Sequence, residues 1–256
     1  MSSKTDEKRD MARYEKAYAE SSFEPVQARM RKQVVLEQLR LWQPASVLEV
    51  GCGADPLFNH YRQFARMVVV EPGRGFSEIA REQAAGSPRI HIIEDFLENA
   101  IESGALTGEH FDCVIVSGLL HELHDPGQLL RVLHRVVGAD CRLHVNVPNA
   151  RSLHRLLAFE MGIVNDIHEI SGRQESLQQN HTFDIKSLKA LCVASGYRVI
   201  EEGSFFVKPF THAQMYLLSE IGLLDERMLT GLMRLEKHLP GMGSEIFVNL
   251  MTAPQA

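Results

Sequence analysis

Short runs of apolar residues recur along most of the chain, and glycine, proline, aspartate or asparagine bounds them. Runs of this length that are rich in valine and isoleucine are typical of buried β-strands. Five such runs occupy residues 46–50, 67–71, 90–93, 111–117 and 141–147. Two later runs, at 197–207 and 244–251, predict two more strands that pair antiparallel at one edge of the sheet.

Between these runs the apolar spacing changes to that of helices. Residues 127–137 form a leucine-rich face after an Asp-Pro start signal. Residues 184–194 form a similar face between an Asp184 N-cap and a Gly196 stop. The alternation predicts an α/β fold with a doubly wound, seven-stranded, mostly parallel sheet covered by helices on both faces.

Three regions do not fit the alternation and are expected to lie over the C-terminal edge of the sheet, where open α/β folds place their ligand crevice. They are a helical stretch at 11–41, broken around 21–25, a helix and irregular connection at 149–182, and a helical stretch at 208–243. The sequence therefore predicts an N-terminal helical lid at 1–42 and an α/β domain at 43–256, with cap insertions around 150–182 and 208–243.

The charge and residue content of the chain argue against several kinds of partner and site. The 33 acidic and 27 basic residues give a formal net charge of −6, which disfavours a nucleic-acid surface. No apolar run could cross a bilayer and the first ten residues are polar, so we expect no membrane insertion and a cytoplasmic location. Scattered cysteines and an HExH segment at 121–124 predict no metal site. The sequence does not indicate an oligomeric state.

The sharpest local signal is an apolar strand that runs directly into Gly51-Cys52-Gly53. Glycine at these positions lets the backbone turn tightly and lets a ligand approach without meeting a Cβ atom. The third glycine of a dinucleotide fingerprint is replaced by Pro56, which disfavours a nicotinamide oxidoreductase. Glu71 closes the next strand about 20 residues later, the spacing at which nucleoside-binding α/β folds present a carboxylate to ribose hydroxyls.

The segment from Glu49 to Gly53 resembles motif I of the class I S-adenosylmethionine-dependent methyltransferases, although many members have glycine where this chain has Asp55. The resemblance implies S-adenosylmethionine as cofactor, with the glycine loop beneath its methionine part and Glu49 supporting the site. Other residues that it places at the cofactor are Pro72 beside Glu71, Asp95 and Phe96 at the adenine, and Ser117 and Gly118 alongside the sulfonium. Segments 146–154 and 180–184 resemble the ubiquinone-biosynthesis-like branch of small-molecule methyltransferases.

Several polar residues could serve the acceptor or the cofactor's methionine end. His121, after the fourth strand, is the first candidate for a general base, and His181 is the second. Asn146 and Asn149 could orient a polar group of the substrate. The resemblance implies an aromatic or an arginine from the N-terminal helices near the methionine carboxylate, with Tyr14 and Arg29 as candidates beside Tyr18 and Arg31. Arg173 and Gln174 could meet an acidic substrate.

Three readings remain open. The first is a methyltransferase on an oxygen, nitrogen or carboxylate of a small molecule. The second is a lyase or cyclase that displaces methylthioadenosine from the same cofactor internally. The third is a non-catalytic binding protein, which the intact loop and the carboxylates at 71 and 95 disfavour.

Overall fold

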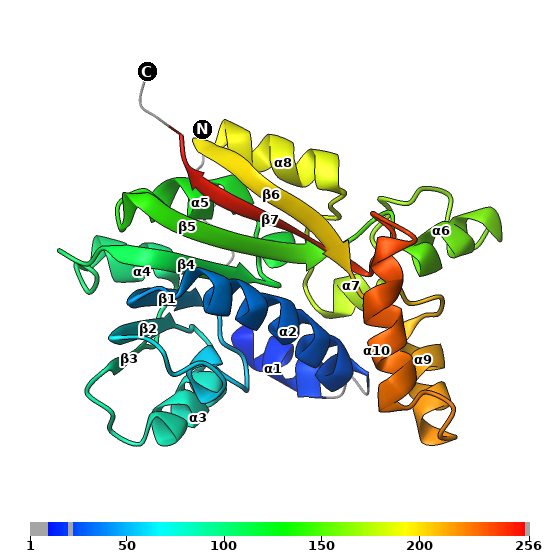
Figure 1. Ribbon diagram of the computed structural model, residues 1–256, viewed down its shortest axis with the longest axis horizontal. Helices are drawn as coiled ribbons and strands as arrows, with labels where there is room; N and C mark the ends of the chain where they lie inside the picture. Colours follow the sequence, from blue (N-terminus) through cyan, green and yellow to red (C-terminus); the bar gives the residue numbers. More distant parts are fainter. Residues whose placement is uncertain (1–9, 20–22, 254–256) are drawn as a thin grey trace.

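The computed structural model describes residues 10–19 and 23–253. Seven strands form one sheet in the order β3-β2-β1-β4-β5-β7-β6 (Figure 1). Their bounds are β1 Ser46–Val50, β2 Arg66–Val70, β3 Ile90–Ile93, β4 Phe111–Ser117, β5 Val137–Pro148, β6 Tyr197–Phe205 and β7 Glu245–Thr252. Strand β7 pairs antiparallel with both β5 and β6, whereas the other pairings are parallel. The predicted doubly wound, mostly parallel sheet is therefore confirmed.

Ten α-helices are found in the described residues, and they cover both faces and one end of this sheet. Their bounds are α1 Met11–Ala19, α2 Glu24–Trp42, α3 Arg74–Ala84, α4 Leu97–Glu102, α5 Pro126–Leu133, α6 Leu153–Glu160, α7 Gly172–Ser176, α8 Ile185–Ala194, α9 His212–Glu220 and α10 Glu226–Arg234. Short 3₁₀ turns lie at Leu57–Asn59, Leu120–Glu122 and Leu235–Lys237. Figure 1 shows α6, α9 and α10 gathered beyond the carboxyl ends of β4 and β5.

Two expected boundaries were wrong. The helix predicted to reach residue 137 ends at Leu133, because Val137 pairs with Phe111 and begins β5. The second strand lies one residue earlier than predicted, so Glu71 follows it instead of closing it. The expected break at 21–25 falls partly outside the described residues. Its last two residues are already helical, since Pro25 occupies the first turn of α2, where a missing N–H costs nothing.

Two apolar layers fill the space on either side of the sheet. One layer joins Leu48, Val68 and Val114 to side chains of α4, α5 and α8. The other joins Val47 and Met67 to α2, α3 and the turn after the glycine loop. Side chains of one strand point alternately to opposite faces, so neighbouring strand residues enter different layers.

A third apolar cluster lies under the cap. It contains Phe23, just before α2, and Met30 and Val34 of α2, together with Phe206 and residues from α9 and α10. The two ends of α2 therefore have different roles: its C-terminal half packs on the sheet and its N-terminal half packs on the cap. This helix joins the expected lid region to the rest of the molecule. In the described residues no helix is long and apolar enough to cross a membrane.

Candidate functional site

The glycine loop after β1 has the conformation that its sequence predicts. Gly51 and Gly53 have φ angles of 76° and 56°, in the left-handed region that other residues rarely adopt. A Cβ atom on Gly53 would meet nothing within 4 Å, so the loop faces open space instead of packed side chains. The Gly51 N–H donates to the Val70 carbonyl (2.9 Å), which fixes the loop against the end of β2.

Glu71 lies directly against this loop. One of its carboxylate oxygens, Oε2, accepts the N–H groups of Cys52 (2.9 Å) and Gly53 (3.1 Å), and Oε1 accepts the Gly73 N–H (2.8 Å). The side chain is only 3% exposed, and burial raises the pKa of its carboxyl against the opposing effect of these hydrogen bonds. Glu71 therefore couples the loop after β1 to the loop after β2.

Glu49 is a second buried carboxyl beneath the loop. Its Oε2 accepts the Leu57 N–H (3.0 Å), and burial raises the pKa of Glu49 to about 8. The Leu57 N–H and the nearby Lys32 lower this pKa, and the charges of Glu71 and Asp55 raise it further. A carboxyl held in this state can change its charge near neutral pH when a cation arrives.

A cavity with a volume of about 720 Å³ opens above the loop. Most of the expected cofactor residues line it: Tyr14, Arg29, Glu49, Gly51, Cys52, Gly53, Glu71, Pro72, Ser117 and Gly118. Asp95 and Phe96 are not among its described lining residues. Asp95 Oδ1 instead accepts the Phe96 N–H (2.8 Å) and the Asn99 side-chain amide (2.7 Å) at the start of α4. The structure therefore brings together the expected residues of the first two loops and of β4, but not those after β3.

The two arginines of α2 that the sequence offered for the cofactor, Arg29 and Arg31, have different partners. Arg29 is about half exposed and donates to both carboxylate oxygens of Glu226 (2.7 and 2.9 Å). Arg31 is largely buried and donates to Glu245 of β7 (2.6 and 2.8 Å). Gly118, just after β4, has a φ angle of 66°, and a Cβ atom there would lie 3.1 Å from the Arg31 guanidinium, so both the backbone and the space favour glycine. Arg31, not Arg29, therefore reaches the end of β4.

The N-terminal helix α1 packs against the first turn of α3, which follows the loop after β2. Tyr14 stands edge-on to Phe76, with 6.4 Å between ring centroids, and Glu15 accepts the Gly75 N–H (3.1 Å) in the first turn of α3. An acidic side chain at a helix N-terminus is favoured by the exposed N–H groups there. The Tyr18 side chain lies outside the described residues.

Asn146 lies inside the sheet, fully buried, and does not line the cavity above the glycine loop. Its Oδ1 accepts the Gly118 N–H (2.9 Å), and its amide donates to the Ser117 hydroxyl (2.9 Å) and faces His144 Nε2 (3.0 Å). Burial lowers the pKa of His144 to about 4, so this ring is neutral and can accept the amide proton. These bonds place Asn146 where it holds the end of β4.

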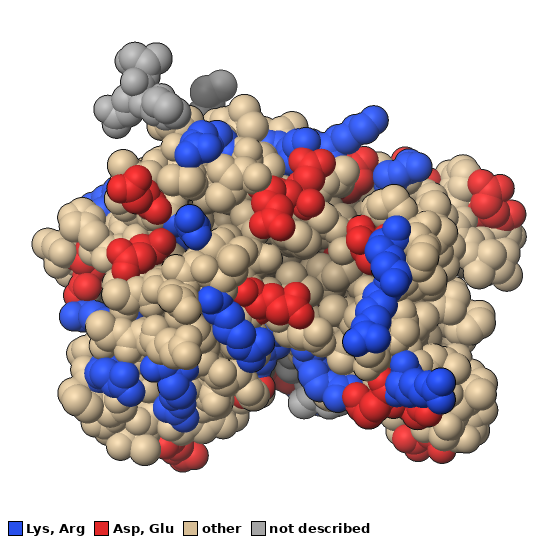
Figure 2. Space-filling model, in the orientation of Figure 1, with Lys and Arg blue, Asp and Glu red and all other residues tan. Residues whose placement is uncertain are grey.

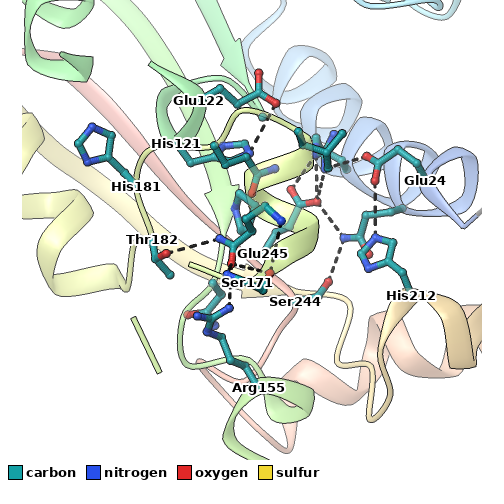
Figure 3. A pocket seen from close by; sticks show the side chains of 18 of the residues that line it. Glu24, His121, Glu122, Arg155, Ser171, His181, Thr182, His212, Ser244 and Glu245 are labelled. Atoms are coloured by element: carbon teal, nitrogen blue, oxygen red, sulfur yellow. Dashed lines mark hydrogen bonds and ion pairs between the residues drawn. The ribbon is translucent and has the colours of Figure 1, made fainter. Parts of the chain in front are cut away.

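A smaller cavity, of about 160 Å³, lies next to the first one, and Figure 3 shows side chains that line it. The two share the lining residues Tyr14, Arg31, Gly118 and Glu122. His121 also lines the smaller cavity, and it is 4% exposed with its Nε2 3.8 Å from the carboxylate of Glu122. His121 and Glu122 come from the 3₁₀ turn after β4, so the expected base lies next to the junction of the two cavities.

The other expected acceptor residues lie around the same small cavity. His181 lines it, and its Nε2 is 3.2 Å from the His124 carbonyl. The Asn149 amide donates to the carbonyls of Gly241 and Gly243, which fixes the loop before β7. Gln174 accepts hydrogen bonds from Ser171 and from Arg155 (3.1 Å). Of Arg173 only the backbone, in α7, is described.

Sequence reasoning missed much of the wall of this cavity. The missed charged and imidazole side chains are Glu24, His154, Arg155, Lys208, His212 and Glu245. They come from α2, α6, the region of α9, and the start of β7, which are far apart in the chain. No local spacing connects these residues. Only the basic and histidine content of 151–155 and 208–212 could have drawn attention to them.

Comparison with known proteins gives a consistent result. A family model described as a methyltransferase domain matches residues 24–202. No curated protein matches the sequence. The structure resembles that of the plantazolicin methyltransferase BamL in complex with a triazolic desmethylPZN analog and SAH (TM-score 0.59, 12% identity, covering 96% of this chain and 97% of that one).

Two other solved structures show how widely this fold is used. The N-methyltransferase NodS from Bradyrhizobium japonicum WM9, in complex with S-adenosyl-l-homocysteine, has a TM-score of 0.52 at 11% identity, covering 93% of this chain and 91% of that one. The [4+2]-cyclase SpnF has a TM-score of 0.53 at 16% identity, covering 87% and 79%. At such identities these likenesses show the fold alone.

Proposed function

The chain belongs to the methyltransferase-domain family, its cofactor is S-adenosylmethionine, and we propose that it transfers the methyl group to a small polar molecule held in the 160 Å³ cavity. The observation that carries the proposal is the junction of the two cavities at Gly118 and Glu122. A donor in the larger cavity and an acceptor in the smaller one would meet there. Holding two reactants in line at contact distance supplies much of the acceleration of such a displacement.

The larger cavity suits the cofactor in size and chemistry. Its volume of about 720 Å³ lies within the usual range for cofactor pockets, and the floor at Gly53 carries no Cβ that would fill it. Bound S-adenosylmethionine would supply an electrophilic methyl group on a positively charged sulfur. We assign Glu71 to the ribose, because a carboxylate can accept hydrogen bonds from two neighbouring hydroxyls at once.

Charged residues on two sides of the cavity would position the methionine end. Glu49 beneath the loop is placed for the ammonium group, and its carboxyl would ionise when that cation binds. Arg31 and Tyr14 line both cavities, so they can contact the carboxylate end and close the junction from above. We assign this role to Arg31 instead of Arg29, because Arg31 lines both cavities and lies against Gly118, whereas Arg29 lines only the larger cavity.

His121 is the proposed general base. A hydroxyl or ammonium acceptor must lose a proton during transfer, and an imidazole ordinarily titrates near neutral pH. The Glu122 carboxylate, 3.8 Å from Nε2, would stabilise the imidazolium that forms. His181 lies to one side of the cluster in Figure 3 and remains the second candidate. Asn146 acts as a positioning residue that fixes Ser117 and Gly118 at the junction.

Product identification tests the proposal. The protein should bind S-adenosylhomocysteine in calorimetry, and with S-adenosylmethionine and a library of small polar acceptors it should release S-adenosylhomocysteine. Release of methylthioadenosine without an added acceptor would instead establish internal displacement. No binding of either nucleoside would refute both activities and leave the non-catalytic alternative.

The proposed setting follows from composition and surface. All four cysteines are free, which is usual in the reducing cytoplasm. Figure 2 shows acidic and basic side chains interspersed on one face, without the continuous basic stripe that a nucleic acid would need. We therefore propose a cytoplasmic enzyme with a small-molecule substrate.

A further inference from the structure

The wall of the smaller cavity opposite Glu122 is rich in cationic and imidazole side chains. Arg155 and Lys208 both line it, together with His154 and His212. Figure 3 shows Arg155 and Glu122 at opposite ends of the cavity in this view. An acceptor whose reacting atom lies beside Glu122 would therefore extend toward the cationic wall.

The charge of Lys208 is already linked to an acidic partner. The side chain is 1% exposed, and its Nζ donates to His212 Nδ1 (2.8 Å). Because an ammonium has no acceptor, His212 must carry its ring proton on Nε2, which faces Glu24 at 3.5 Å. These contacts connect Lys208 to Glu24 through His212, so the negative charge of Glu24 offsets part of the positive charge that Lys208 brings to the cavity wall.

Arg155 is a cation of this wall that donates its hydrogen bonds to carbonyl and amide oxygens and not to a carboxylate. Its Nε and one Nη donate to the carbonyls of Ile167 and Glu169, and the other Nη donates to Gln174 (3.1 Å). A guanidinium has five N–H groups, so two remain for a ligand. Burial lowers the pKa of Arg155, although the charges of Glu169 and Asp166 oppose this effect. In the described residues no carboxylate forms an ion pair with it.

His154, which precedes Arg155 in α6, also has unused hydrogen-bonding capacity at this wall. Its Nδ1 is buried and has no hydrogen-bond partner among the described residues. Its pKa lies well below the usual value because of burial and then because of Lys208, His212 and Arg155. All three neighbours carry or can carry positive charge, so the position is electrostatically suited to an anion. A buried polar atom without a partner usually acquires one from a ligand or from water.

We propose that His154, Arg155 and Lys208 form an oxyanion subsite that binds a carboxylate of the acceptor, so that the substrate is a small acid methylated at its other end. A carboxylate matches the planar fork of a guanidinium, and a cavity of about 160 Å³ favours a small group. This inference rests on the proposed function, because it identifies the substrate class of the same site.

The test compares acids with their uncharged amides. The full chain, saturated with S-adenosylhomocysteine, is titrated in a calorimeter with lactate and lactamide, glycine and glycinamide, and 3-hydroxybenzoate and 3-hydroxybenzamide. At least one acid should bind about tenfold more tightly than its amide, the ratio expected for a single charge-assisted hydrogen bond. Inorganic phosphate is the competing probe, and the proposal expects it to bind more weakly than the preferred acid.

Variants then locate the preference. Arg155→Gln should abolish it, Arg155→Lys should retain part of it, and the exposed neighbour Arg151 serves as the control through Arg151→Gln. Since Arg155 also holds two carbonyls of the cap, His154→Asp provides an independent change. It places an internal carboxylate in the subsite and should remove acid binding even if Arg155→Gln fails to fold.

The outcomes separate the two proposals. Equal affinity for acids and amides, stronger binding of phosphate, or a preference that persists in both Arg155→Gln and His154→Asp would overturn the subsite. Binding of S-adenosylhomocysteine with no binding of any acid would also overturn it and leave the methyltransferase proposal intact. Failure to bind S-adenosylhomocysteine would refute the proposed function itself.

Discussion

Glu49 provides the strongest prediction, because its carboxyl should lose a proton when the cofactor binds. Its pKa is about 8 in the ligand-free protein, so at pH 7 about nine tenths of the molecules carry the proton. A cofactor ammonium within about 4 Å, at an effective dielectric constant of about 20, favours the ionised form by about 4 kcal/mol, or about three pKa units. Binding at pH 7 should therefore release about 0.9 proton.

The same carboxyl should make stability depend on pH. Its folded pKa of about 8 lies above its usual value of 4.5, so between these values the native state holds a proton that the unfolded chain releases. The contribution is complete below pH 4.5 and is lost as the pH rises through 8. At about 1.4 kcal/mol per pKa unit, the loss reaches at most about 5 kcal/mol. Glu49→Gln removes it, so this variant should gain stability relative to the wild type as the pH rises.

Calorimetry in buffers of different ionisation enthalpy measures the released proton directly. With S-adenosylhomocysteine at pH 7, the apparent binding enthalpy should differ between phosphate and Tris by the buffer difference multiplied by about 0.9 for the wild type. For Glu49→Gln the two buffers should agree. Equal enthalpies in both buffers for the wild type, or the same proton release from Glu49→Gln, would show that this carboxyl is not the group that titrates.

Three further predictions follow from the buried contacts. Glu71→Ala leaves three N–H groups without their acceptor, so it should lower the free energy of unfolding by about 3 kcal/mol, measured by urea denaturation. It should also weaken S-adenosylhomocysteine binding at least about tenfold. Unchanged affinity would show that Glu71 does not contact the cofactor. Arg31→Met leaves the carboxylate of Glu245, whose side chain is 2% exposed, without its cationic partner, and should lower the free energy of unfolding by about 3–5 kcal/mol in the same assay. Adding Glu245→Gln should recover part of this loss. If the losses of the two single variants simply add in the double variant, the pairing would be contradicted. His121→Asn should reduce kcat, measured with an acceptor found in the library, by about 10²- to 10⁴-fold and leave the affinity for S-adenosylhomocysteine unchanged. A wild-type rate would mean that His121 is not the base. Glu122→Gln should reduce kcat less, because Glu122 acts through the imidazole of His121.

The sheet and the glycine loop could be predicted from the amino-acid sequence, because both depend on local patterns. The apolar runs specify buried strands wherever they occur, and a glycine pair after the first strand needs only its own backbone to adopt positive φ angles. Glu71 was also identifiable, since the carboxyl ends of adjacent parallel strands meet at one edge of the sheet. The limits of elements were less certain: whether Val137 ends a helix or begins a strand depends on its pairing with Phe111.

The construction of the smaller cavity, in contrast, follows from packing between elements that are distant in the chain. Arg29 and Arg31 are equally plausible in the sequence, and their roles differ because one lies opposite Glu226 and the other opposite Glu245. The charges of Arg155 and Lys208 converge only after the cap folds over the end of β4. A site assembled from side chains on separate elements leaves no spacing in the chain, because the distances that define it arise from packing and not from the backbone between its residues.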